Sequence, residues 1–141
     1  MWTIDEGIAA LKKKGAKITA QRIAILKHLE SRTDHPSADV LYRELAQEYP
    51  AMSVATVYST AQLLADAGLI KILSIDEKRV YFDPTTDLHG HFLCRKCGKL
   101  IDIDVEESAL LEPVYRHKDE ISQIQQAEVF LYGLCTECSD D

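Results

Sequence analysis

Residues 53–82 read SVATVYSTAQLLADAGLIKILSIDEKRVYF, and their pattern is the most informative one about the fold. Ser53 is a favourable helix N-cap, and the apolar residues after it recur at helical spacing until Gly68, which is expected at the C-terminal end. The expected buried stripe consists of Val54, Val57, Ala61 and Leu64. Two strand-like runs follow, 69–75 and 79–82, joined by a short charged turn. A helix followed by a β-hairpin is therefore expected here.

Three further helices are expected before this stretch. The first covers residues 5–14 and ends at Gly15. Thr19 is the expected N-cap of the second helix and Ser37 that of the third, which Pro50 stops. Three to four helices and a hairpin within about 80 residues are typical of a winged helix-turn-helix domain, in which the helix before the hairpin enters the major groove of DNA.

The exposed face of the expected 53–67 helix offers hydroxyl and methyl groups but neither arginine nor lysine. Hydroxyls can bind phosphates or base edges and methyl groups can contact thymine, so this face favours A·T-rich double-stranded DNA. A merely solvated surface helix has a similar composition, but nearby lysines add charge that attracts phosphates. The candidate DNA contacts are Lys17, Arg22, Ser53, Ala55, Thr56, Tyr58 and Ser59.

Charge is distributed unevenly along the 141 residues, whose net charge is −7. Residues 1–82 carry 11 basic and 10 acidic side chains, whereas residues 83–141 carry 5 and 13. Only the first part could approach DNA without strong repulsion. The composition is that of a soluble globular protein, with no run of about 20 apolar residues for a membrane span. The N-terminus does not resemble a secretory signal, so we expect a cytoplasmic protein.

The four cysteines form two CxxC pairs, at 94–97 and at 135–138. Cytosolic thiols are kept reduced, so two such pairs favour a tetrahedral zinc site over disulfides. Redox-active motifs and incidental buried thiols are the alternatives. The expected structural Zn²⁺ ligands are Cys94, Cys97, Cys135 and Cys138.

Histidines and aspartates suggest a second metal site. His89 and His91 alternate on an extended segment, which places both imidazoles on one face. Asp83 ends the expected hairpin, and Asp102 alternates with apolar neighbours. Imidazoles and carboxylates without thiolate favour Fe²⁺, Mn²⁺ or Zn²⁺. Non-haem oxygenases use such donors, but no substrate-pocket signature accompanies them, so we expect no enzyme. His35, before Pro36, is by itself an ordinary loop residue.

Five motifs resemble the ferric uptake regulator family, in the order in which that family has them. They are ITAQR at 18–22, HPSA at 35–38, SVATVY at 53–58, HGH at 89–91 followed by the first CxxC, and YGL at 132–134 followed by the second. The resemblance implies an α+β protein with an N-terminal winged-helix DNA-binding domain at 1–83. A small α/β dimerisation domain with a four-cysteine zinc site would occupy 84–141. It further implies a homodimeric, metal-dependent repressor, which binds operator DNA as an inverted repeat.

Within this family the sequence is most similar to the peroxide-sensing, PerR-like branch. The resemblance implies a regulatory Fe²⁺ or Mn²⁺ site at His35, Asp83, His89, His91 and Asp102. Peroxide would then oxidise His35 and His89 and release the repressor from DNA. The sequence lacks an imidazole at 125–128, where iron-sensing members often have one, and lacks a basic residue near Ser59. An iron-, manganese- or zinc-responsive repressor without peroxide sensing is the alternative.

Overall fold

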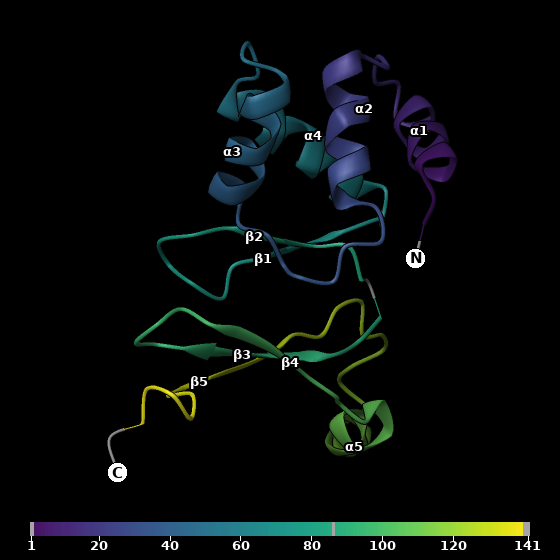
Figure 1. Ribbon diagram of the computed structural model, residues 1–141. Helices are drawn as coiled ribbons and strands as arrows, with labels where there is room; N and C mark the ends of the chain where they lie inside the picture. The colour runs from purple at the N-terminus through teal and green to yellow at the C-terminus, as the bar shows by residue number, and fades with distance from the viewer. Residues whose placement is uncertain (1, 86, 140–141) are drawn as a thin grey trace. The chain divides into compact units, whose positions relative to one another are not determined.

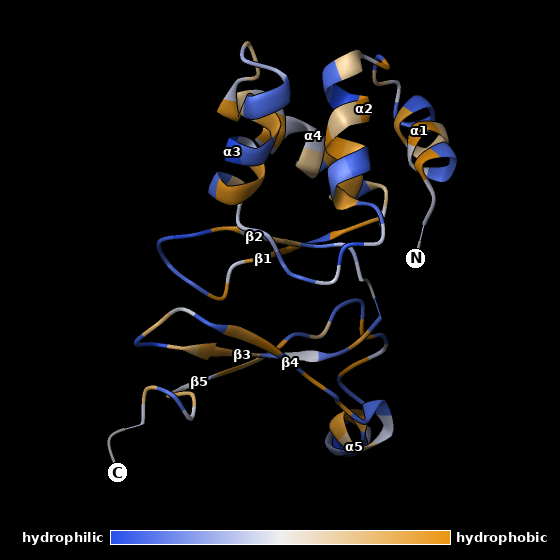
Figure 2. Cartoon of the chain, viewed as in Figure 1, coloured by the Kyte–Doolittle hydropathy of each residue, from blue (hydrophilic) through white to orange (hydrophobic). Residues whose placement is uncertain are grey.

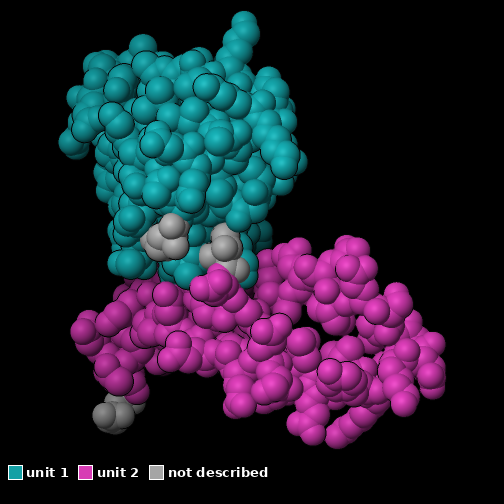
Figure 3. Space-filling model, turned by 90° about the vertical axis from the view of Figure 1, so that its right-hand side faces the viewer, with its two compact units in different colours: residues 1–86 teal, residues 87–141 magenta. Residues whose placement is uncertain are grey.

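The computed structural model describes residues 2–85 and 87–139, and the chain divides into two compact units, residues 1–86 and 87–141 (Figures 1 and 3). The first unit contains four helices and a two-stranded sheet, and the second is built on a three-stranded sheet. Within the described residues, no helix combines the length and the apolar character that crossing a membrane requires.

Each helix of the first unit begins directly after a threonine or serine. The helices are α1 (Ile4–Lys13), α2 (Ala20–Leu29), α3 (Ala38–Glu48) and α4 (Val54–Asp66). In each case the hydroxyl of the capping residue accepts a hydrogen bond from the backbone N–H three residues later; the caps are Thr3, Thr19, Ser37 and Ser53. The three caps expected from the sequence are thus confirmed. Such a bond satisfies one of the free N–H groups at a helix start.

The hairpin after α4 is shorter than its sequence pattern predicted. Strand β1 (Lys71–Leu73) pairs antiparallel with β2 (Tyr81–Asp83), and Ile72 lies opposite Phe82. The backbone N–H of Leu69 still bonds to a carbonyl of α4, so the strand starts later than expected. The chain leaves α4 at Gly68, whose φ of 77° lies in the left-handed region that glycine readily adopts.

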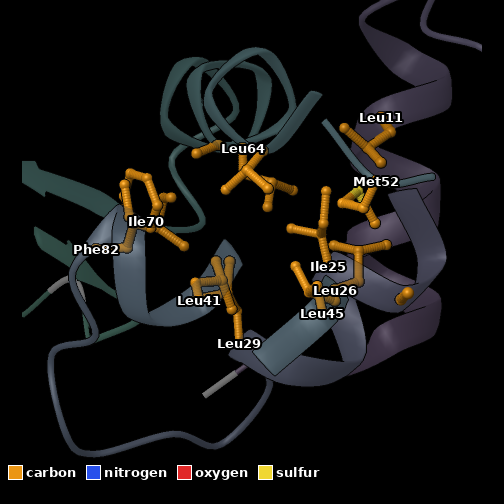
Figure 4. Packing of buried hydrophobic residues seen from close by; sticks show 14 of the residues in the cluster. Leu11, Ile25, Leu26, Leu29, Leu41, Leu45, Met52, Leu64, Ile70 and Phe82 are labelled. Carbon is orange, nitrogen blue, oxygen red and sulfur yellow. The ribbon is translucent and has the colours of Figure 1, made fainter. Parts of the chain in front are cut away.

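The helices of the first unit enclose an apolar core (Figure 4), and Figure 2 shows that α1, α2 and α3 each carry both hydrophobic and hydrophilic residues. Val57, Ala61 and Leu64 of α4 are buried as predicted. The predicted burial of Val54 is wrong, because the first turn of α4 extends past the core and leaves this side chain 40% exposed. Thr60 is buried in the stripe instead.

The second unit has β3 (Gly90–Cys94) at the centre of its sheet. Strand β4 (Leu100–Ile103) pairs with β3 antiparallel, and β5 (Val129–Gly133) pairs with β3 parallel. The helix α5 (Glu107–Leu111) and a 3₁₀ helix (Glu112–His117) lie between β4 and β5 in the sequence. Helices and mainly antiparallel sheets in the two units confirm the α+β class.

Candidate metal centres

The parallel pairing of β3 and β5 brings the two CxxC pairs together. Cys94 is the last residue of β3 and lies opposite Gly133 at the end of β5. Since parallel strands end at the same edge of a sheet, both cysteine turns leave from one edge. The backbone N–H of Arg95 donates to the carbonyl of Gly133 at 2.8 Å and joins the two turns.

The four sulfur atoms fit a tetrahedral metal. One ligand atom from each of the four cysteines lies within 4.8 Å of all the others, and the Sγ atoms of Cys97 and Cys135 are 3.8 Å apart. Zinc–sulfur bonds of ~2.3 Å imply a sulfur–sulfur separation of about 3.8 Å along a tetrahedral edge. All four cysteines are free of disulfides. The arrangement therefore suits a closed structural site of the zinc type.

The thiols of this cluster do not ionise alike. Backbone N–H groups of Cys97 and Cys135 lower the pKa of the Cys94 thiol to about 6, because they stabilise the thiolate. The pKa of Cys138 rises to about 12, chiefly through its contact with the sulfur of Cys135. A bound cation would stabilise the thiolate form, which is the form in which cysteine binds a metal.

A second group of donors surrounds the start of β3. His91 and Asp102 are register partners on β3 and β4, and Nε2 of His91 lies 3.6 Å from Oδ1 of Asp102. Nε2 of His89 lies 3.8 Å from the same oxygen, and the two imidazole centroids are 4.4 Å apart. Nδ1 of His89 is 2.7 Å from the carbonyl of Asp87. If Nδ1 donates this hydrogen bond, Nε2 carries the lone pair that a metal requires.

The remaining two sequence-predicted ligands meet within the first unit. Nδ1 of His35 lies 3.3 Å from Oδ1 of Asp83, and both side chains are almost fully buried. Asp83 is the last residue of β2. The residue after His35 is hydrogen-bonded to the same strand, because the N–H of Phe82 donates to the carbonyl of Pro36 at 2.9 Å. Within the first unit the structure thus brings His35 to Asp83, and within the second unit it brings His89 and His91 to Asp102.

Sequence reasoning missed a charged network beside His35. Arg32 forms ion pairs with Asp34 and Glu44 and is mostly buried. Hydrogen bonds from Arg32 lower the pKa of both carboxyl groups, and Asp34 is the immediate neighbour of His35 in sequence. The opposite charges of residues 32 and 34 could have indicated that these two side chains pair. Glu44 is twelve residues from Arg32, so no local pattern indicates that it belongs to the network.

The candidate DNA contacts lie at the surface of the first unit. A surface groove is lined by Lys17 and Arg22 together with Thr56 and Ser59 of α4. Nη1 of Arg22 donates to the carbonyl of Lys17 at 2.7 Å, which links the two basic residues. Ser53, Ala55 and Tyr58 are exposed, although the Ser53 hydroxyl also caps α4. The structure thus gathers the hydroxyls and the charges near the start of α4.

Known proteins resemble the chain in sequence and in fold. The sequence profile of the ferric uptake regulator family matches residues 13–132. The peroxide-responsive repressor PerR of Staphylococcus epidermidis is 35% identical over 138 residues, which are 98% of this chain and 91% of that protein. The solved PerR of Streptococcus pyogenes, described for peroxide sensing and gene regulation, is 30% identical with a TM-score of 0.54, covering 99% of this chain and 95% of that one. The Fur protein of Helicobacter pylori shares the fold, with a TM-score of 0.81 at 20% identity over 99% of this chain and 96% of that one.

Proposed function

Because the chain belongs to the ferric uptake regulator family, we propose that it is a peroxide-sensing repressor whose operator binding depends on a regulatory Fe²⁺ or Mn²⁺ ion. Members of this family are dimeric, metal-binding regulators of transcription. The chain is accordingly a metal-responsive DNA-binding repressor and not an enzyme. Its proposed role places it in the cytoplasm, together with the DNA that it regulates.

The observation that carries this proposal is the donor chemistry of the two His/Asp groups. Three imidazoles and two carboxylates, with no sulfur, suit Fe²⁺ or Mn²⁺, whereas the four cysteines suit structural Zn²⁺. The proposed regulatory ligands are His35, Asp83, His89, His91 and Asp102. Two of them belong to the unit that contains α4, and three belong to the other unit.

This distribution of ligands gives the regulatory metal a way to act on DNA binding. An ion that takes ligands from both units favours those arrangements of the units in which all the ligands can reach it. A ligand shifts a conformational equilibrium only through its different affinities for the two states. Metal binding therefore promotes operator binding if the arrangement that it favours is also the one that fits the DNA. Moving the population from 1:99 to 99:1 requires about 5.5 kcal/mol.

Release by peroxide follows from the chemistry of the ligands. Bound ferrous iron supplies the redox chemistry that breaks the O–O bond of peroxide. With iron held by these residues, one oxygen would be added to an imidazole of His35 or His89, and the other would leave as water. An oxidised imidazole is a poorer ligand, so the chain would lose its regulatory metal and with it its affinity for DNA. Manganese does not readily promote this cleavage, so the manganese form should bind DNA without responding to peroxide.

The proposed DNA contacts are the polar start of α4 and the basic residues beside it. Thr56 and Ser59 of α4 line the same groove as Lys17 and Arg22. Tyr58 is 41% exposed and packs edge-on against Phe82, which limits the movement of its ring. Lysine and arginine contact phosphates, and small polar side chains contact base edges. An A·T-rich inverted repeat is the operator we propose, because Ala55 and Thr56 offer methyl groups to thymine and members of this family are dimers.

The test is DNA binding by the zinc-loaded protein with iron, manganese or zinc added, each with and without hydrogen peroxide. We expect both the iron and the manganese forms to bind, and only the iron form to be released by peroxide. Mass spectrometry should find one added oxygen on a peptide that contains His35 or His89. If the iron form keeps its DNA affinity and gains no oxygen, the protein is a metal-responsive repressor without peroxide sensing.

A further inference from the structure

Arg32 is the centre of a hydrogen-bonded network that joins the loop after α2 to helix α3. Its Nε and Nη2 donate to the two carboxylate oxygens of Asp34 at 2.6 and 3.0 Å. Its Nη1 and Nη2 donate to the two oxygens of Glu44 at 2.7 and 3.0 Å. One guanidinium thus binds two carboxylates, each through a pair of hydrogen bonds. Lysine cannot reproduce this geometry.

This network is more than an exposed ion pair. The Arg32 side chain is only 16% exposed, and its Nη1 also lies 3.5 Å from the carbonyl of His28 near the end of α2. Surface ion pairs contribute little because water competes for both partners. The burial of the guanidinium and its paired bonds reduce that competition. Arg32 therefore holds together the end of α2, the following loop and α3.

The backbone before Arg32 has an unusual conformation. Ser31 has a φ of 56°, in the left-handed region that residues other than glycine seldom adopt. Surrounding contacts must hold a residue in this conformation. The N–H of Arg32 bonds to the carbonyl of Leu29 at 3.3 Å, and its side chain reaches α3. The Arg32 contacts are thus among those that maintain the turn.

His35 lies between this network and a second anchor. On its N-terminal side, Asp34 is tied through Arg32 to α3. On its C-terminal side, the carbonyl of Pro36 accepts from Phe82, and the N–H of Ala38 donates to the carbonyl of Val80 at 2.9 Å. The loop is consequently held on both sides of His35, by α3 on the N-terminal side and by β2 on the C-terminal side.

We propose that Arg32 is a positioning residue that holds the Asp34–His35 loop in place for the regulatory metal. This inference rests on the proposed role of His35 as a ligand. A loop that is already ordered loses less freedom when its histidine binds a metal, so the metal binds more tightly. Since Glu44 belongs to α3, which packs against α4, the network also ties the ligand loop to the helices around the DNA-binding surface.

Substitution of Arg32 separates positioning from simple electrostatics. Removing a positive charge near a cation site should strengthen metal binding if charge alone matters. Loss of positioning should weaken it. We expect Arg32→Met to bind Mn²⁺ about tenfold more weakly, the lower end of the losses seen when the supports of metal ligands are removed. Arg32→Lys should fall between Arg32→Met and wild type, because lysine keeps the charge but cannot grip both carboxylates.

The experiment compares these variants with Arg43→Met, which removes an exposed arginine of α3. Zinc-loaded proteins are titrated with Mn²⁺ by calorimetry at a temperature at which the fluorescence of Trp2, the chain's single tryptophan, shows each to be folded. Hydrogen exchange of residues 31–35 is measured without Mn²⁺. We expect faster exchange in Arg32→Met and no change in Arg43→Met. Asp34→Asn, which removes one of the two carboxylates that Arg32 binds, should lower Mn²⁺ affinity and also speed the exchange of residues 31–35.

The outcomes distinguish this inference from the proposed function. Unchanged or tighter Mn²⁺ binding by Arg32→Met, or unchanged exchange of residues 31–35, overturns the positioning role. If His35→Ala lowers Mn²⁺ affinity while Arg32→Met does not, His35 remains a ligand and only this inference fails. If His35→Ala binds Mn²⁺ as wild type does, the proposed regulatory site is itself wrong.

Discussion

His91 and Asp102 face each other across the β3–β4 pair, with Nε2 and Oδ1 separated by 3.6 Å. Because they are register partners, the sheet itself determines the distance between their backbones. The His91 imidazole is buried, whereas half of the Asp102 side chain is exposed. The pair thus joins a buried imidazole, a proposed metal ligand, to a carboxylate that solvent can reach.

The length of this carboxylate side chain should control the peroxide response. We expect Asp102→Glu to bind iron and DNA but to resist oxidation, because one extra methylene changes how the carboxylate approaches the metal. Mass spectrometry after stoichiometric peroxide measures the oxygen added to His35 and His89. Asp104→Glu, the same change at a nearby exposed aspartate, is the control and should be oxidised as wild type is. Equal oxidation of all three proteins would show that Asp102 does not govern the reaction.

Replacement of His35 by alanine should abolish metal-dependent DNA binding and leave the fold and the structural zinc intact. His35 is the one imidazole proposed as a ligand from the unit that contains α4, so its loss removes a link between metal and DNA-binding helices. Operator binding with and without Mn²⁺ measures the effect, and zinc content checks the cysteine site. His117→Ala, at an exposed histidine, serves as the control. Full metal-dependent affinity in His35→Ala would contradict the proposal.

Loss of one zinc-site cysteine should unfold or monomerise the second unit. Cys97→Ser leaves three sulfurs at the edge where β3 and β5 end, and a four-thiolate zinc contributes its binding free energy directly to folding. Zinc analysis and analytical ultracentrifugation test this, with Thr136→Ser in the second CxxC turn as a conservative control. A zinc-free Cys97→Ser dimer with the wild-type melting temperature would rule out the structural role.

Replacement of Thr60 by valine should stabilise the first unit. Thr60 is fully buried in α4, and among the described residues its hydroxyl has no hydrogen-bond partner. A buried unsatisfied hydroxyl costs about 1 kcal/mol or more, and valine has nearly the same shape. We expect the free energy of unfolding, followed by Trp2 fluorescence, to rise by about 1 kcal/mol. Thr33→Val, the matched change at an exposed threonine, should alter the free energy of unfolding by less than about 0.5 kcal/mol. A lower free energy of unfolding in Thr60→Val would mean that the Thr60 hydroxyl is hydrogen-bonded in solution.

The contribution of Arg32 to stability should depend on pH. Its hydrogen bonds lower the pKa of Glu44 in the folded protein, so the unfolded chain binds this proton more readily. The resulting stabilisation is fully present above the unfolded pKa, about 4.3, and is lost as the pH falls through the lower folded value. Arg32→Met should therefore be less stable than wild type at pH 7, with a smaller difference at pH 3.5. Trp2, buried in the first unit and hydrogen-bonded to the Leu69 carbonyl, reports its unfolding by denaturant. An equal difference at both pH values would contradict this.

Local chemistry made the helix starts predictable from the sequence. Thr19, Ser37 and Ser53 each accept a bond from an N–H only three residues away, so the residues that determine the cap are contiguous in the chain. The two CxxC pairs indicated a tetrahedral metal in the same way, because thiolate chemistry and short spacing are visible without a fold. The spacing of His89 and His91 likewise placed two imidazoles together. The selection of His35 came from resemblance to the family, since nothing in its own neighbourhood distinguishes it from a loop histidine.

Which distant segments meet depends on long-range packing and could not be read from local patterns. The parallel pairing of β3 with β5 joins segments separated by more than thirty residues, and many registers are compatible with their apolar patterns. The burial of Thr60 in place of Val54 depends on where α4 passes the end of the core, which helical periodicity does not specify. Glu44 binds Arg32, twelve residues earlier in the chain, because α3 packs beside α2. The helix starts and the types of metal donor could be predicted from the sequence because they depend on neighbouring residues, whereas long-range packing sets how these parts combine.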